Sequence, residues 1–273
     1  MAGFAQRHAM TFAEILSNLR DAVMAPSLTP IIVAGTLGSV LFAALLRGFT
    51  GFGFALAGVP LLSQFIAPAH AVPIAVLLQF FLGFFDWRTA SKQCHWPSLG
   101  WLSAGAAVGS PIGAFALSAV PAPIARIVIA IVLVIAVATL GRGFALEKIP
   151  GRMVTLATGF VSGLFNGLAA MSGPPVVIYY MSGPFGRLTV RASLMIFFFV
   201  VSAVALVSMI PLGLISAEVL ILSALSAPML LIGTWLGSLG FHHGSERLHR
   251  NVSIVMLAVI ALTTLAKGVS EIA

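Results

Sequence analysis

The sequence predicts an all-α protein that crosses a membrane several times, and three observations predict this class. Hydrophobic residues make up 60% of the 273 residues and charged residues only 8%, whereas a soluble domain carries about 25% charged residues. The mean hydropathy is +1.11. Several apolar stretches reach the roughly 20 residues that an α-helix needs to cross a bilayer. The fold class is therefore a polytopic helical membrane protein.

Apolar segments follow one another along the chain, after an N-terminal segment at 1–29 that we expect to be amphipathic and to lie on the membrane surface. The first and fifth segments are too long for one ordinary span, and both contain glycines and prolines that interrupt helices. We therefore expect these two segments to be broken or re-entrant. The eight segments are 30–67, 70–87, 97–119, 122–141, 152–183, 190–211, 214–240 and 250–267.

The two halves of the chain are related by shifts in residue number. A shift of 115 aligns the two long segments, and a shift of 124 aligns later segments, including Arg126 with Arg250. We therefore divide the chain into a first membrane repeat at 30–141, a linker loop at 142–151 and a second membrane repeat at 152–273. The first shift pairs Gly48 with Gly163, Ala55 with Ala170, Gly58 with Gly173 and Pro60 with Pro175.

Loop charge bears on whether these repeats are parallel or inverted. If the long segments return to the side from which they start, the basic loops around Arg88, Arg152, Arg187 and Arg247 share one side. The loop at 212–218, which has no Lys or Arg, then falls on the other side, as the positive-inside rule requires. If the fifth segment crosses fully, this agreement is lost. We therefore predict inverted repeats, with two basic residues on the unfavoured side, Arg126 and Lys267.

The two breaks are the predicted binding site. Where a helix restarts inside a membrane, its free N–H groups make a positive pocket that suits an anion. Restarts are expected near Gly53–Phe54 and Gly173–Pro175, both facing a shared site at the membrane midplane. The predicted substrate-binding residues at the breaks are Thr50, Gly51, Gly53, Asn166, Gly167, Ser172, Gly173 and Pro174.

Small residues also let helices pack closely, and this is the alternative role for the break glycines. Helix packing is the expected role for the other glycines within apolar segments. These glycines are Gly35, Gly38, Gly105, Gly109, Gly113, Gly233 and Gly237.

Two polar residues inside apolar segments complete the predicted site. Arg47 ends an apolar run, and a cation inside a membrane indicates a functional role; a guanidinium also suits a sulfonate or carboxylate. Arg47 could instead reach the membrane surface or a helix C-terminus. Gln79 could bind substrate, or could form a hydrogen bond between helices. Asp86 is expected to pair with its neighbour Arg88.

Other classes of function find little support. The net charge of +7 suits orientation in a membrane better than nucleic-acid binding. Cys94 is the single cysteine, so no disulfide can form within the chain. No nucleotide-binding loop or hydrolase motif is present, so we expect no enzyme activity and no cofactor. No metal site is expected, because three histidines in one loop lack the other ligands of a zinc site: His242, His243 and His249.

The paired motifs resemble the TauE/SafE family of sulfite exporters and sulfonate permeases. One motif is Gly48-x-x-Gly51-x-Gly53 leading to Pro60, and the other is Gly163-x-x-x-Gly167 leading to Gly173-Pro174-Pro175. The family's run of consecutive glycines is thinned here. The resemblance implies secondary transport of sulfur-containing or related organic anions across the cytoplasmic membrane of a bacterium.

The hypothesis from the sequence is therefore a secondary transporter that works by alternating access. Its substrate would be sulfite or an organosulfonate such as sulfoacetate. A transporter of another organic anion or of a cation, and a membrane scaffold that transports nothing, are the alternatives. The expected partners are the small anion and the bilayer, without nucleic acid, and a homodimer stays an open alternative. The expected location is the bacterial inner membrane.

Overall fold

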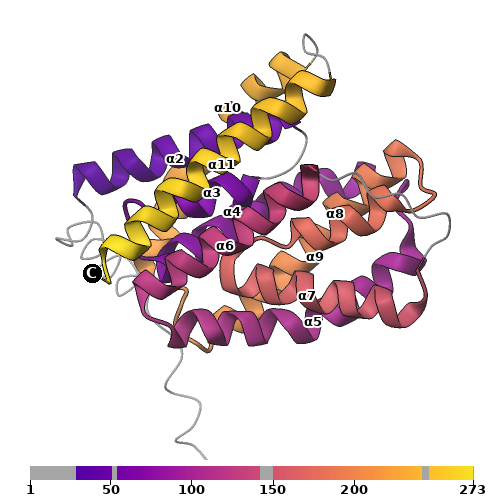
Figure 1. Ribbon diagram of the computed structural model, residues 1–273, viewed down its shortest axis with the longest axis horizontal. Helices are drawn as coiled ribbons and strands as arrows, with labels where there is room; N and C mark the ends of the chain where they lie inside the picture. The colour runs from indigo at the N-terminus through magenta and orange to yellow at the C-terminus, as the bar shows by residue number, and fades with distance from the viewer. Residues whose placement is uncertain (1–28, 51–53, 142–149, 242–245, 273) are drawn as a thin grey trace, which may run out of the picture.

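The computed structural model describes residues 29–50, 54–141, 150–241 and 246–272. Within these ranges the chain forms helices and no strands, which confirms the predicted all-α class (Figure 1). The amphipathic segment and the linker loop lie almost wholly outside the described residues. The helices are α2 Pro30–Thr50, α3 Phe54–Leu62, α4 Pro68–Ala90, α5 Trp96–Ala119, α6 Ala122–Gly141, α7 Arg152–Ala169, α8 Gly173–Ser182, α9 Arg187–Met209, α10 Ala217–Phe241 and α11 Glu246–Ser270.

The lengths of the apolar helices and the exposed apolar side chains confirm that this is a membrane protein. In the described chain, α2, α4, α5, α9 and α10 are long and apolar enough to cross a bilayer, and α6 and α11 contain shorter apolar stretches. Large apolar side chains also point outward, among them Phe84 and Val207, each 70% exposed. Outward apolar side chains of this kind are stable when lipid covers them.

The first broken segment folds back on itself. A Cβ atom at Gly35, near the start of α2, would lie 2.4 Å from the ring of Phe65, which follows α3. A Cβ atom at Gly58, inside α3, would lie 3.5 Å from Ala43 in the middle of α2. The pairs approach in opposite order along the chain, so α3 runs antiparallel to α2 and returns toward its start. All but one of the α3 side chains are buried.

The second broken segment also folds back. The Thr155 hydroxyl, in the first turn of α7, lies 3.1 Å from the Tyr179 hydroxyl, near the end of α8. Between the two helices, Ala170 takes the left-handed conformation, with φ 56°. Its N–H donates to the Asn166 carbonyl at 2.7 Å. The two breaks are offset, because the shift of 115 would start α3 at Gly58, and α3 starts four residues earlier.

Each broken segment packs along a helix of the other half of the chain. On α5 and α7, a Cβ atom at Gly109 would lie 2.1 Å from the Phe160 carbonyl oxygen. On α10 and α2, a Cβ atom at Gly237 would lie 2.2 Å from the Leu45 carbonyl oxygen. Figure 1 shows α5 and α7 side by side at the lower edge of the view. Only glycine permits backbones to approach so closely.

The remaining long helices pair with their counterparts in opposite directions. Phe80 of α4 stacks on Phe199 of α9, with ring centroids 4.9 Å apart. Beyond the end of α4, the His95 N–H donates to the Ser193 hydroxyl near the start of α9. These two contacts set α4 and α9 antiparallel. Reciprocal contacts of this kind support the predicted inverted repeat, which stays a prediction.

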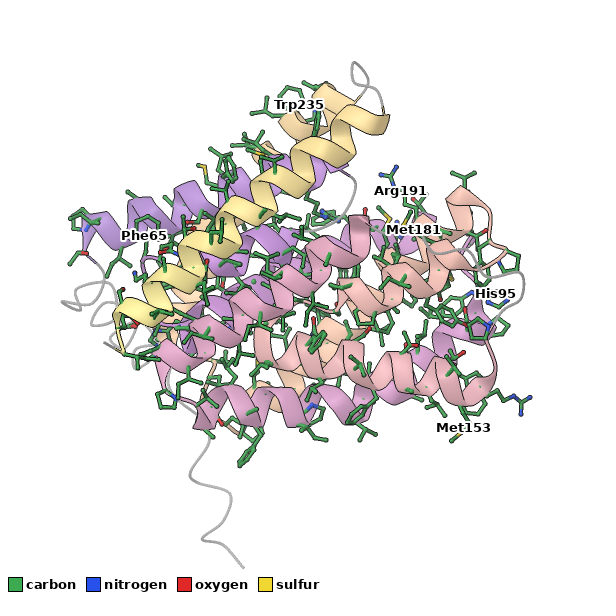
Figure 2. The ribbon with its side chains drawn as sticks, in the orientation of Figure 1. Phe65, His95, Met153, Met181, Arg191 and Trp235 are labelled. Carbon is green, nitrogen blue, oxygen red and sulfur yellow. The ribbon has the colours of Figure 1, made fainter. Side chains whose placement is uncertain are left out.

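The basic loops gather at one end of the molecule. Figure 2 shows His95, Met153 and Arg191 together at the right of the view and Phe65 at the left. The end that contains His95 is called the basic end, because Arg88, Lys92 and the first residues of α7 and α9 lie there. The positive-inside rule predicts that the basic end faces the cytoplasm, and this orientation stays a prediction.

Candidate functional site

The second break ends in a helix start of unusual composition. Ser172 is the N-cap of α8, and Gly173, Pro174 and Pro175 follow as its first three residues. An N-cap hydroxyl normally accepts a hydrogen bond from the second or third N–H of the helix. Both of these residues are prolines and have no N–H. The Ser172 hydroxyl is consequently buried without a hydrogen-bond partner in the described chain.

Asn166 lies one turn before the end of α7 and is fully buried. Its Nδ2 donates to the Val201 carbonyl oxygen of α9 at 3.2 Å. This bond fixes the orientation of the amide, so that Oδ1 points away from Val201. Among the described residues, Oδ1 has no hydrogen-bond partner. An amide oxygen can only accept, so Asn166 offers a buried acceptor beside the break.

One turn of α9 brings these residues together. Asn166 bonds to Val201, and a Cβ atom at Gly173 would lie 3.9 Å from the Phe198 ring. Ser202 lies on the same turn, and its hydroxyl is buried and unpartnered in the described chain. The break-2 site is defined here as Asn166, Ser172, Gly173 and Ser202. Its polar groups are two hydroxyls, one amide oxygen and the Gly173 N–H.

Gln79 lies on α4, which packs against α9 next to the break-2 site. Phe80, its neighbour on α4, stacks on Phe199 of the same α9 turn. The Gln79 Oε1 atom is buried and makes no hydrogen bond within the described chain. The helix-to-helix hydrogen bond that we considered for Gln79 is therefore not made by this oxygen.

Two of the predicted residues at this break have other surroundings. A Cβ atom at Gly167 would lie 2.1 Å from the Ser110 carbonyl oxygen of α5. The close approach of two helices accounts for this glycine. Pro174 begins α8 but has no N–H to offer a ligand. Neither residue has a polar side chain to offer a ligand.

The first break is described only at its edges. α2 is described up to Thr50 and α3 from Phe54 onward, next to the restart expected near Gly53–Phe54. Gly51 and Gly53 lie outside the described residues, and so does the side chain of Thr50. Phe54 and Ala55 belong to the same apolar core as Ala169, Ala170 and Met171 of the second break. A substrate site shared by the two breaks stays a prediction.

Arg47 is part of an ion pair. Its Nη2 lies 3.2 Å from Asp86 Oδ2 on α4, and the two side chains are 17% and 32% exposed. The expected pairing of Asp86 with Arg88 is wrong, because Asp86 points toward α2 and not along its own helix. The ion pair joins the last turn of α2 to α4 near the basic end.

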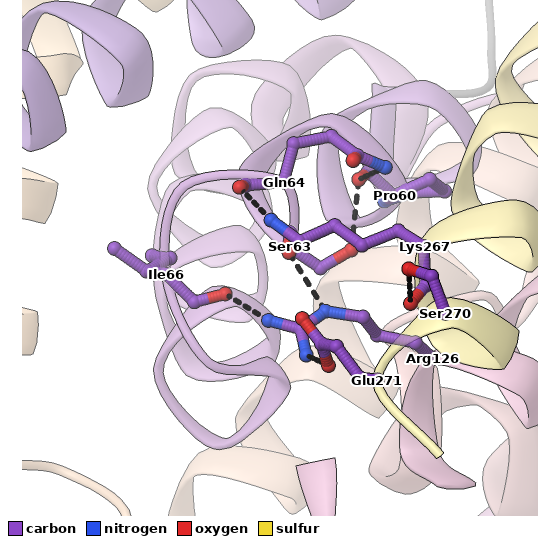
Figure 3. A network of polar contacts seen from close by, with 8 residues as sticks. All are labelled: Pro60, Ser63, Gln64, Ile66, Arg126, Lys267, Ser270 and Glu271. Atoms are coloured by element: carbon purple, nitrogen blue, oxygen red, sulfur yellow. Dashed lines mark hydrogen bonds and ion pairs between the residues drawn. The ribbon is translucent and has the colours of Figure 1, made fainter. Parts of the chain in front are cut away.

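A second group of charges lies at the opposite end, where α3 finishes (Figure 3). Arg126 of α6 donates from Nε to the Ser63 carbonyl oxygen at 2.9 Å, and also pairs with Glu271. Lys267 of α11 donates to the Gln64 carbonyl oxygen. The two basic residues on the unfavoured side are thus bound to the carbonyl end of a buried half-helix. In the sequence, the unfavoured position of Arg126 and Lys267 indicated that these residues have a specific role. It did not indicate that they bind the carbonyl groups after α3.

The break-2 site is polar and uncharged. The charged residues of the helices around it lie at their basic ends, at Asp86, Arg88, Arg152, Arg187 and Arg191; α5 and α8 have none. Within the described residues, no group of three or more His, Cys, Asp or Glu could hold a metal ion. The site can therefore exchange hydrogen bonds with a small ligand.

Comparison with known families identifies the chain. The family model described as "Sulfite exporter TauE/SafE" matches residues 15–264, which is nearly the whole length. Comparisons with curated proteins and with solved structures gave no match. Two re-entrant hairpins, long apolar helices and this match agree with one another. The chain belongs to the sulfite exporter TauE/SafE family of membrane transporters.

Proposed function

We propose that this protein is a secondary transporter of a small sulfur-containing anion, sulfite or an organosulfonate, in the inner membrane of a bacterium. The observation that carries the proposal is the break-2 site. There the half-helix α8 begins at Gly173, whose N–H has no partner within its own helix, and the Ser172 hydroxyl is buried without a partner in the described chain. Half-helix N-termini of this kind hold anionic groups in transporters.

The first half of the chain supplies the proposed means of exposing the site alternately. Near the basic end, Arg47 and Asp86 join α2 to α4. At the other end, Lys267 of the second half binds the carbonyl end of α3 in the first half. Movement of the second half against the first would break the Lys267 link. The Arg47–Asp86 pair lies within the first half and would open only if α2 and α4 also move apart. In the proposed cycle the two links open at different times, one at each end of the molecule, and expose the site alternately.

A cation is the second candidate substrate, and a specific observation favours it. Asn166 Oδ1 and Gln79 Oε1 are buried oxygens that can only accept, and oxygen atoms are the ligands that hard cations prefer. The N-terminus of α8 opposes this reading, because its partial charge is positive. The anion is therefore the better-supported ligand.

The test is flux into proteoliposomes that contain the purified protein. Labelled sulfite, methanesulfonate and sulfoacetate would be compared with labelled sodium and with empty vesicles. Ser172→Ala removes a hydroxyl, and Gly173→Leu fills the space beside Phe198. Both variants should lower flux, whereas Gly100→Ala, which has open space around it, should not. Wild-type flux in Ser172→Ala and Gly173→Leu would show that the break-2 site is wrong.

Arg47 has a separate test in the same assay. Arg47→Ala should reduce flux if the guanidinium meets the anion once the pair with Asp86 opens. If Arg47→Ala transports normally while Gly173→Leu does not, the substrate is bound by the break alone. Normal transport in both variants would contradict the whole proposed site.

A further inference from the structure

We infer that the species bound at the break-2 site is a singly charged anion that carries its own proton, hydrogensulfite and not doubly charged sulfite. This inference rests on the proposed function. Its first ground is the absence of a counter-charge. The polar groups of the break-2 site are neutral, and the charged residues of the described helices around it lie at their basic ends.

Charge burial in an uncharged site favours the monoanion. The cost of moving an ion out of water into a medium of low dielectric constant grows with the square of its charge. Hydrogen bonds from hydroxyls and one N–H can offset this cost for one negative charge more readily than for two. A dianion needs a nearby cation, and Arg47 is occupied by Asp86.

The second ground is the Asn166 oxygen. Because Nδ2 donates to Val201, the amide is held with Oδ1 free, and this atom is buried without a partner in the described chain. An unpartnered buried acceptor is costly, so the ligand that satisfies it is favoured. Sulfite and sulfonates have only acceptor oxygens. Hydrogensulfite has a proton to donate to Oδ1 and still has oxygens to accept from Ser172, Ser202 and the Gly173 N–H.

The ionisable groups of the described helices around the site lie away from it. On α4 the nearest ionisable groups are Asp86 and Arg88, two turns beyond Gln79, and on α8 they are Tyr179 and Tyr180, at its far end. On α7 and α9 the ionisable groups are at the basic ends, at Arg152, Arg187 and Arg191; α5 has none, and Arg126 of α6 is bound at the opposite end. A pH dependence that follows protonation of sulfite is therefore expected to come from the ligand.

The experiment is the pH dependence of wild-type flux, with equal pH on both sides of the vesicle and the membrane potential clamped. Sulfite takes up a proton near neutral pH, whereas methanesulfonate keeps one charge and no proton throughout. Above the pKa of hydrogensulfite, the apparent KM for total sulfite should rise by about tenfold per pH unit, with kcat unchanged. The KM for methanesulfonate should stay constant and exceed that for hydrogensulfite by about tenfold or more.

Asn166→Leu adds a second measurement. The variant should bring the KM values for hydrogensulfite and methanesulfonate together, because the acceptor that separates them is gone. Thermal melting in detergent would show whether the variant is folded, and the wild-type profile does not depend on it. Sulfoacetate, which carries two charges, should be a poor substrate.

The outcomes separate this inference from the proposed function. A KM for total sulfite that is constant or falls as the pH rises would overturn the inference and leave the transporter intact. If the KM for methanesulfonate changes with pH in the same way as the KM for total sulfite, the inference is also overturned. The titrating group would then belong to the protein and not to the ligand. Sulfite flux that needs sodium and ignores pH would assign Asn166 Oδ1 to a cation. Absence of flux for sulfite and both sulfonates would contradict the proposed function itself.

Discussion

The guanidinium of Arg126 donates a hydrogen bond from Nε to the carbonyl oxygen of Ser63, 2.9 Å away. Ser63 follows α3, whose last carbonyl groups accept hydrogen bonds from the N–H groups of residues 63–66. The carbonyl groups of Ser63 and Gln64 come next, and the side chains of Arg126 and Lys267 donate to them. The contact between Arg126 and Ser63 is buried, and a buried carbonyl without a partner is costly. Arg126 and Lys267 therefore complete α3, and the cationic charge also suits its C-terminus.

Replacement of Arg126 by Met should destabilise the protein by about 2 kcal/mol or more, because charged hydrogen bonds to buried carbonyls are lost. Lys92→Met is the matched control, since it removes one positive charge from an exposed loop position. Thermal melting in detergent would compare the two variants. Equal melting temperatures for Arg126→Met and Lys92→Met would show that the Arg126 contacts contribute nothing to stability.

The glycines of α5 offer a test of the helix packing. Gly109→Ala places a methyl group 2.1 Å from the Phe160 carbonyl oxygen, so α5 and α7 must separate. We expect a loss of about 1–3 kcal/mol, as for overpacked cores. Gly100→Ala on the same helix meets open space and should stabilise it by about 0.5–1 kcal/mol. Unchanged melting of Gly109→Ala would contradict the close contact of the two helices.

Replacement of Ala170 by glycine should stabilise the protein. Its φ of 56° lies in the left-handed region, which costs a residue with a Cβ atom about 1–2 kcal/mol. Ala170→Gly removes that cost and should raise the melting temperature, whereas Ala170→Val should lower it. The order Gly above Ala above Val is the expected result. Any order with valine at the top would mean that the turn between α7 and α8 has another conformation.

The ion pair between Arg47 and Asp86 can be measured by a double-mutant cycle. Arg47→Gln and Asp86→Asn would be melted singly and together, and the coupling should be about 1 kcal/mol, since both side chains are partly exposed. Flux in Asp86→Asn adds a functional readout, because the variant frees Arg47 for an anion. Additive single effects would mean that the two charges do not interact.

The orientation of the basic end can be read from Cys94, the single cysteine of the chain. Cys94 lies between α4 and α5, so a maleimide that cannot cross membranes should label it only from the cytoplasmic side. Burial raises the pKa of the Cys94 thiol, so less of the reactive thiolate is present at neutral pH. Labelling should therefore accelerate as the pH rises, by about tenfold per unit up to that pKa.

A cysteine at the other end provides the control for this labelling. Ala119→Cys combined with Cys94→Ser places the thiol at the far end of α5, where Ala119 is exposed. It should react only from the outside. Labelling of both cysteines from the same side would contradict the course of α5 across the membrane.

The positions of the breaks could be predicted from the sequence because their causes are local. Glycines and prolines fix where a helix stops, and α3 and α8 begin at Phe54 and Gly173, where the pattern placed them. The pairing of Gly109 with Phe160 and of Arg126 with Ser63 could not be predicted. These contacts join residues that are distant in the chain and depend on which helices become neighbours.

Composition and periodic breakers thus determined by themselves that the chain crosses a membrane as helices, that two segments are interrupted, and which residues lie at the interruptions. Only the tertiary structure decided which polar groups remain unpartnered. The Asn166 side chain has an unpartnered acceptor oxygen because its Nδ2 donates to the Val201 carbonyl of another helix. The Ser172 hydroxyl has no partner because prolines occupy the second and third positions of α8. Hydrogen-bond satisfaction is a property of neighbours in space, so the chemical character of the site emerges only with the fold.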